Sequence, residues 1–126
     1  MAIPDLSDIP ELSPVAPNVE YDLKITKAKE IKSKNTGREG ILIICDIAGE
    51  ENAENLLHTL WLPNDGDEEG KQKTMWRMIK EFLSSIGAPT DGMETEELEG
   101  MSFSAILGQE KDDRTGRMRN TIQRVV

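Results

Sequence analysis

Only one stretch of this chain spaces its apolar residues as an α-helix does, and this leaves a β-rich fold as the main possibility. In residues 71–86 apolar side chains recur at i, i+3, i+4 and i+7, and Gly87 and Pro89 follow. The helical apolar positions are Met75, Met78, Ile79, Phe82, Leu83 and Ile86. The other patterned segments alternate with a period of two, which is typical of half-buried strands.

Five strands are predicted, at residues 20–32, 38–48, 55–62, 101–107 and 117–126. In the first, alternation fails past Ala28, which predicts a bulge or bend. The second is apolar on both faces, as expected near the centre of a sheet. The third places Leu56, His58, Leu60 and Leu62 on one face and Leu57, Thr59 and Trp61 on the other, and Pro63 ends it. No internal repeat is evident.

Three strands, a helix and two strands match the five-stranded oligonucleotide/oligosaccharide-binding (OB) fold, a small barrel with its helix between strands three and four. An open α+β sheet with the helix on one face is the competing architecture, because strand order cannot be read from the sequence. We assign residues 20–126 to this mainly β, OB-fold-like domain. Residues 1–19 form an acidic N-terminal arm with four prolines.

The arm has two readings. Ile3, Leu6, Ile9 and Leu12 recur at every third residue, a spacing that suits an extended polyproline-like segment lying on a surface. A mobile tail is the alternative.

Charge is segregated along the chain, which carries a formal net charge of −9. Residues 24–38 hold six basic side chains and one acid, and residues 111–124 hold five basic side chains and two acids. In contrast, residues 1–22, 46–69 and 91–99 contain acids and no Lys or Arg. Because a polyanion responds to the local patch that it meets, these two segments allow a nucleic-acid partner in spite of the overall charge.

Catalysis finds little support in the residues. Cys45 lies in an apolar run and is expected to be a buried, inert thiol, and His58 is expected to be a core or edge residue. The acidic run 64–69 lacks the ligand spacing of a Ca²⁺ loop and is better explained as a solvated loop near the helix N-terminus. No nucleophile motif, phosphate loop or metal-ligand spacing occurs. We therefore expect no enzymatic activity, metal or cofactor.

The basic segments supply the candidate site. In the predicted barrel the first and last hairpins flank the oligonucleotide-binding face, so their cations would line two rims of one groove. Trp61 is the best stacking platform because it lies opposite the leucine row, whereas Tyr21 and Trp76 are expected to be structural. The predicted nucleic-acid-binding residues are Lys24, Lys27, Lys29, Lys32, Lys34, Arg38, Trp61, Arg114, Arg117, Arg119 and Arg124.

Several stretches resemble a known family. Residues 21–29, 36–40 and 54–63, together with Ile3-Pro4-Asp5-Leu6-Ser7-Asp8-Ile9-Pro10, are similar to small proteins of tailed bacteriophages. Members of that family are described as a domain of unknown function or as single-stranded DNA-binding proteins of the replication and recombination module. The resemblance implies the barrel fold and sequence-independent binding of single-stranded DNA in the cytoplasm of an infected bacterium.

Phage or host replication and recombination proteins are further expected partners. The longest apolar run has five residues, so no membrane association is expected, and the oligomeric state stays open. A protein-interaction module whose acidic faces contact a host or phage enzyme is the alternative function. We also expect the acidic arm to lie in the basic groove of its own or a neighbouring chain and to compete with DNA.

Overall fold

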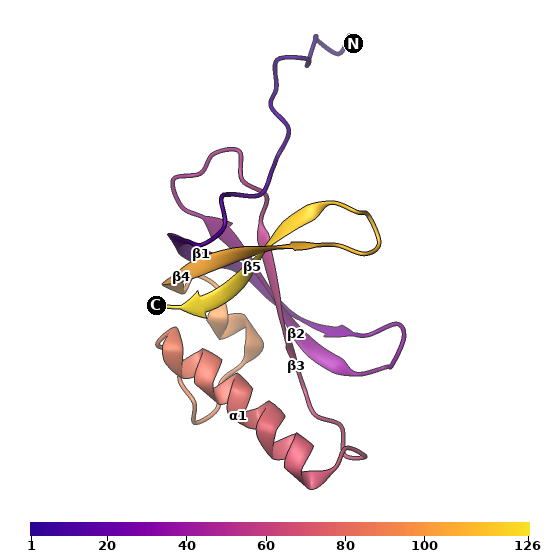
Figure 1. Cartoon of the computed structure of the whole chain (residues 1–126), viewed down its shortest axis with the longest axis vertical. Coiled ribbons are helices and arrows are strands. Elements are labelled where there is room, and N and C mark those ends of the chain that lie inside the picture. The colour runs from indigo at the N-terminus through magenta and orange to yellow at the C-terminus, as the bar shows by residue number, and fades with distance from the viewer.

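The strands and the helix lie where the sequence predicts them, to within a few residues. The computed structural model describes residues 1–126, and its main elements follow one another along the chain as shown in Figure 1. They are β1 (Val19–Lys32), β2 (Glu39–Ile47), β3 (Leu56–Trp61), α1 (Glu69–Ser85), η1 (Thr95–Leu98), β4 (Ser102–Lys111) and β5 (Met118–Val125). The short 3₁₀-helix η1 was not predicted; it lies within the acidic linker between α1 and β4.

One antiparallel sheet contains all five strands, in the order β3-β2-β1-β4-β5. The mainly β class and the helix between β3 and β4 are thus confirmed. No hydrogen-bonded ladder joins the edge strands β3 and β5, so the sheet is not closed. These edges nevertheless approach each other, with Cα atoms of β3 and β5 within 8 Å.

β1 contains the predicted bulge, but it lies earlier than the failure of alternation indicated. The register with β2 shifts between Ile25 and Lys27, so that Thr26 is the extra residue, instead of past Ala28. At this point β4 begins, and residues 100–101 just before it continue the pairing with β1: the Gly100 N–H donates to the Ile25 carbonyl at 2.7 Å, and the Ile25 N–H donates to the Met101 carbonyl at 2.8 Å. The bulge therefore marks where β1 leaves β4 and continues with β2 alone.

The core lies between the inner face of the sheet and the α1–η1 segment. Strand residues such as Ile25, Ile43 and Leu107 are fully buried, and Ile79 of α1 and Leu98 of η1 cover them. Met78, which the helical pattern placed in the core, is 64% exposed. The face of α1 that packs on the sheet is narrower than the arc over which its apolar residues are distributed. Neither helix is long and apolar enough to cross a lipid bilayer.

The C-terminus of α1 is closed by a Schellman motif, as Gly87 indicated. Gly87 adopts φ 80°, and the Ala88 N–H donates to the Leu83 carbonyl at 2.8 Å. The chain then returns along the sheet towards η1, which leaves an apolar cleft beside α1.

Part of the N-terminal arm is bonded to the sheet. Ser13 forms a short parallel bridge with Ala53, and the amide of buried Asn120 bonds the Val15 backbone in both directions, at 2.8 and 3.0 Å. The Asn18 N–H donates to Leu107 at 2.7 Å. Residues 13–18 are thus tied between the β2–β3 connection and β5, and the exposed residues 1–12, called here the free arm, extend away from the sheet (Figure 1).

Candidate nucleic-acid interface

The bulge in β1 collects three lysines on the outer face of the sheet, the face directed away from α1. Lys24 lies opposite Asp46, Lys27 opposite Ile44 and Lys29 opposite Leu42, and these partners point outward because their neighbours Ile43, Cys45 and Ile47 are buried. Without the extra residue, Lys27 and Lys29 would share the parity of Leu23 and Ile25 and point into the core. We call Lys24, Lys27 and Lys29 the lysine row; all three are exposed.

Cross-strand registers connect the lysine row to β3. Lys27, Ile44 and Leu57 form one transverse row on the outer face, and Lys29, Leu42 and Thr59 form the next. Since neighbouring strands lie about 4.8 Å apart, each row spans about 10 Å. The outer face of β1, β2 and β3 therefore presents cations along one side and apolar side chains along the other.

Trp61 ends the third row, opposite Gly40 and Ile31. Its side chain is on the outer face, as predicted, and Trp61 is 40% exposed while Leu56 and Leu60 are buried on the other face. A Cβ built at Gly40 would meet the Trp61 ring at 2.8 Å, so the indole packs directly over the glycine backbone. The prediction that Trp61 is exposed is confirmed; the role of Gly40 as its support was missed.

The two basic hairpins end in turns with the same sequence pattern and backbone geometry, a short match that the charge pattern did not reveal. Lys32-Ser33-Lys34-Asn35-Thr36-Gly37-Arg38 matches Lys111-Asp112-Asp113-Arg114-Thr115-Gly116-Arg117 at four of seven positions. Both turns have a glycine at φ 72°. In each, the glycine N–H donates to the second residue, whose own N–H donates to the closing arginine's carbonyl, at 2.7–2.9 Å.

Figure 1 shows the tips of both hairpins extending on the same side of the molecule. Lys34 and Arg114 are both exposed in their turns but do not correspond: Lys34 aligns with Asp113, and Arg114 aligns with Asn35. The repeated Lys-x-x-x-Thr-Gly-Arg sequence could have been found by aligning the two basic segments with each other. The two basic segments found from charge therefore end in turns of one type.

The closing arginines of the two turns have different environments. Arg38 donates to both carboxylate oxygens of Asp67, at 2.9 and 3.1 Å, and to the Leu62 carbonyl at 2.9 Å, and its side chain is only 18% exposed. This hydrogen-bonded pair lowers the pKa of Asp67 to about 2 and raises that of Arg38. Arg38 thus holds the 64–67 loop against the sheet rather than lining the outer face.

Asp67 is the exception in the 64–69 loop, whose other residues are exposed as predicted. Its side chain is 12% exposed, and it also accepts the Asn64 N–H at 2.8 Å. Glu69 alone supplies an acidic side chain to the first turn of α1. The described residues include no group of three His, Cys, Asp or Glu side chains that could hold a metal ion.

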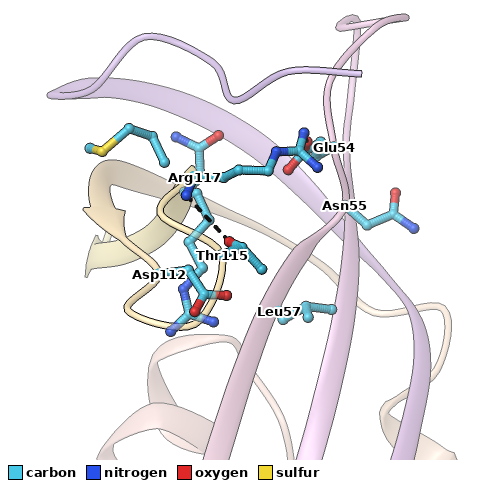
Figure 2. Close-up of a pocket in the computed structure, with 9 residues that line it drawn as sticks. Glu54, Asn55, Leu57, Asp112, Thr115 and Arg117 are labelled. Atoms are coloured by element: carbon cyan, nitrogen blue, oxygen red, sulfur yellow. Dashed lines mark hydrogen bonds and ion pairs between the residues drawn. The ribbon is translucent and has the colours of Figure 1, made fainter. Parts of the chain in front are cut away.

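Arg117, in contrast, lies at an open pocket between β3 and the second turn (Figure 2). Its guanidinium donates to Glu54 at 2.6 Å, but the Arg117 side chain is 68% exposed. Glu54, Asn55 and Leu57 face the turn residues Asp112 and Thr115 across a volume of about 210 Å³. Met118, Arg119 and Asn120 complete the lining, so two of the predicted arginines line the same pocket as the outer-face residue Leu57.

The remaining predicted cations lie nearer the edges of this surface. Lys32 is exposed opposite Glu39 at the end of β1, on the face opposite the Ile31–Gly40–Trp61 row, and Arg124 lies opposite Ile106 near the end of β5, away from the pocket. Arg119 lies opposite Glu110. The lysine row, Trp61, Arg117 and Arg119 are therefore connected through the outer faces of β2 and β3, whereas Lys32, Arg38 and Arg124 are not part of that surface.

The single histidine and cysteine belong to the core side of the sheet. His58 stacks on Phe82 of α1 with ring centroids 4.8 Å apart, and burial lowers its pKa. Cys45 is fully buried, and burial together with nearby Asp46 raises its pKa to about 12. Tyr21 is half-buried against the core and donates to the Ala16 carbonyl at 3.1 Å, while Trp76 is 52% exposed at the apolar cleft.

The free arm does not lie along the lysine row. Its last residues, Glu11 and Leu12, line an open pocket with Glu54 and Arg117. Residues 6–9 form a turn closed by the Ile9 N–H and the Leu6 carbonyl at 3.1 Å, so the arm is not one continuous extended segment.

A scan against models of known protein families returns no match for this chain, and a search of curated proteins finds no similar sequence.

Proposed function

We propose that this protein binds single-stranded DNA without regard to sequence and without a catalytic step. The strand lies across the outer face of β1, β2 and β3, between the two matching turns. The observation that carries the proposal is the β1 bulge, which turns Lys27 and Lys29 outward next to Lys24 and opposite the apolar residues of β3. A cationic track beside an apolar, aromatic surface is what an unpaired strand requires, because phosphates and bases are presented together.

Each part of the surface has a role. The lysine row neutralises phosphates on one side, and Arg117 and Arg119 do so beside the second turn. Trp61 stacks a base on the ring face that is turned away from Gly40, and Leu57 adds apolar contact. Since only one aromatic platform is present, phosphate contacts dominate, and affinity falls steeply with salt.

The finer fold assignment is part of this proposal. The order β3-β2-β1-β4-β5, with its two edges close together and the helix after β3, is the arrangement expected of an OB-type barrel whose β3–β5 seam is not hydrogen-bonded. The Arg117–Glu54 ion pair and the bonded residues 13–18 bridge this seam. With the resemblance to phage single-stranded DNA-binding proteins, this supports a role in a phage replication or recombination module.

A salt titration with a short fluorescent oligo-dT tests the proposal. Wild-type protein should bind, with log affinity falling linearly in log salt between about 50 and 200 mM. Replacing the lysine row in K24A/K27A/K29A should reduce the slope by about 2, since each lost phosphate contact on a single strand contributes about 0.7. The matched control K71A/K73A/K80A removes the same charge from α1.

If both triple variants reduce the slope equally, net charge and not the outer face determines binding, and the assigned surface is wrong. Absence of binding by wild-type protein at low salt rejects the function and favours the acidic protein-interaction module. A second pair tests Trp61: W61F retains a platform, whereas W61A should lose about tenfold in affinity for oligo-dT. Arg38 is left intact in these variants because its loss would release the Asp67 loop.

A further inference from the structure

The free arm presents a row of apolar side chains that nothing in its own chain covers. Ile3, Leu6, Ile9 and Leu12 are each more than half exposed. The turn at residues 6–9 is preformed: the Ser7 N–H donates to the Asp5 carboxylate at 2.9 Å, a bond that lowers the pKa of Asp5. Preformed order in an exposed apolar segment reduces the entropy lost when it binds a partner.

A matching acceptor lies at the other end of the molecule (Figure 1). The apolar cleft between α1, the sheet edge and the 89–95 segment has a volume of about 350 Å³. Its apolar lining includes Ile41, Leu62, Trp76, Leu83, Pro89 and Met93. Trp76 is 52% exposed there, so the cleft holds a large aromatic surface in contact with water.

We propose that the free arm of one copy docks in the α1 cleft of a second copy. The arm carries acids at residues 5, 8 and 11 and no Lys or Arg. Lys73, Arg77 and Lys80 recur at i, i+4 and i+7 on α1 and form a basic stripe beside the cleft, with Lys80 in its lining. The opposite wall carries the acids of 91–97, so the acidic side of the arm faces α1.

The two surfaces differ and lie at opposite ends of one chain, so their contact is heterologous, head to tail, and each added copy leaves one arm and one cleft unpaired. About ten arm residues are fewer than the roughly 20–30 per side of a standard interface, so the contact is weak between free molecules. Copies that share one DNA strand are held at a high effective concentration, which promotes the contact. Only this last step rests on the proposed function.

Sedimentation velocity over a range of protein concentrations tests self-association without DNA. Wild-type protein should sediment faster as concentration rises. L6D/I9D, which disrupts the arm, and W76D, which disrupts the cleft, should each weaken association at least tenfold. V126D and M78D are matched controls, because Val126 and Met78 are 63% and 64% exposed and lie outside both surfaces.

Mixing the two disrupted variants gives the sharpest result. L6D/I9D retains a cleft and W76D retains an arm, so the mixture should form 1:1 dimers and no larger species. Wild-type protein that stays monomeric at high micromolar concentration overturns the proposal, as does a mixture that forms no dimers. A monomer whose Trp76 fluorescence shifts on deletion of residues 1–12 overturns it as well, since the arm would then occupy its own cleft.

Oligonucleotide binding, measured beside self-association, distinguishes a failure of the arm–cleft contact from a failure of the proposed function. If self-association persists but no oligonucleotide binds, the inference stands and the function fails. If both hold, wild-type protein should bind long oligo-dT cooperatively, and L6D/I9D should bind it without cooperativity while its affinity for a short oligonucleotide is unchanged.

Discussion

Gly40→Ala probes the contact that supports the exposed face of Trp61. The added Cβ would lie 2.8 Å from Cε3 of the indole and 3.2 Å from the Leu60 carbonyl oxygen. Ordinary carbon–carbon contacts are about 3.5–4.0 Å, so the ring must move by close to 1 Å or more. Overpacking of this kind lowers the free energy of unfolding by about 1–3 kcal/mol. Replacing glycine also reduces the conformational entropy of the unfolded chain, which raises the free energy of unfolding by about 0.4–1 kcal/mol.

The expected net effect is a destabilisation of about 1 kcal/mol, or a fall in Tm of about 3–5 °C for a chain of this size. In a Trp61→Ala background the obstacle is absent, and the same substitution at residue 40 should be neutral or slightly stabilising. Urea unfolding followed by far-UV circular dichroism measures all four proteins of this double-mutant cycle. Because the indole is displaced, Gly40→Ala alone should also weaken oligo-dT binding several-fold.

Equal costs in the two backgrounds, with a coupling below about 0.5 kcal/mol, would refute the reasoning. The Leu60 carbonyl, and not the indole, would then set the cost. An unchanged affinity for oligo-dT in a variant whose Trp61 fluorescence has shifted would show that the position of this ring does not matter for binding.

Three further predictions concern the supports of the site. The pKa of Asp67 is about 2 against an ordinary 3.8, so its ion pair with Arg38 stabilises the fold fully above pH 4 and is lost as pH falls towards 2. Asp67→Asn should therefore be less stable than wild type at neutral pH and equally stable near pH 2. Parallel curves of unfolding free energy against pH would contradict this. Burial raises the pKa of Cys45 to about 12, so native protein should not react with a thiol reagent at about pH 8 until it is unfolded, and rapid labelling would contradict its placement. Asn120→Ala removes the amide that bonds the Val15 backbone. It should lower the free energy of unfolding, measured in urea, by about 1–3 kcal/mol and expose residues 13–18 to proteolysis. An unchanged digestion pattern would show that these hydrogen bonds do not hold the segment.

The local pattern of the sequence was sufficient to locate the elements. Alternation and helical spacing depend on neighbours a few residues away, so the five strands, α1 and the outward direction of Trp61 follow from the sequence. The burial of Cys45 and the leucine-face position of His58 follow for the same reason. The match between the two Thr-Gly-Arg turns was also present in the sequence, but a search by charge alone did not find it.

Long-range partners could not be read in this way. From the charge pattern, Arg38 and Arg117 were both predicted to bind nucleic acid. In the structure Arg38 is held by Asp67, whereas Arg117 is mostly exposed beside Glu54. The acids in these pairs are 29 and 63 residues away in sequence, so only folding decides which of them meets which arginine. The bonds from Asn120 to Val15 span 105 residues and were equally inaccessible to sequence reasoning.

The sequence by itself thus determined the order of strands and helix and the segregation of charge, since both depend on residue type and short-range periodicity. Tertiary structure alone decided which cations share a face. The single extra residue in β1 reverses the direction of Lys27 and Lys29, because side chains in a strand alternate and a shift of one residue exchanges the two faces. The bulge coincides with the point where β4 begins and residues 100–101 continue the pairing with β1, whereas the failure of alternation within β1 indicated a bulge only past Ala28.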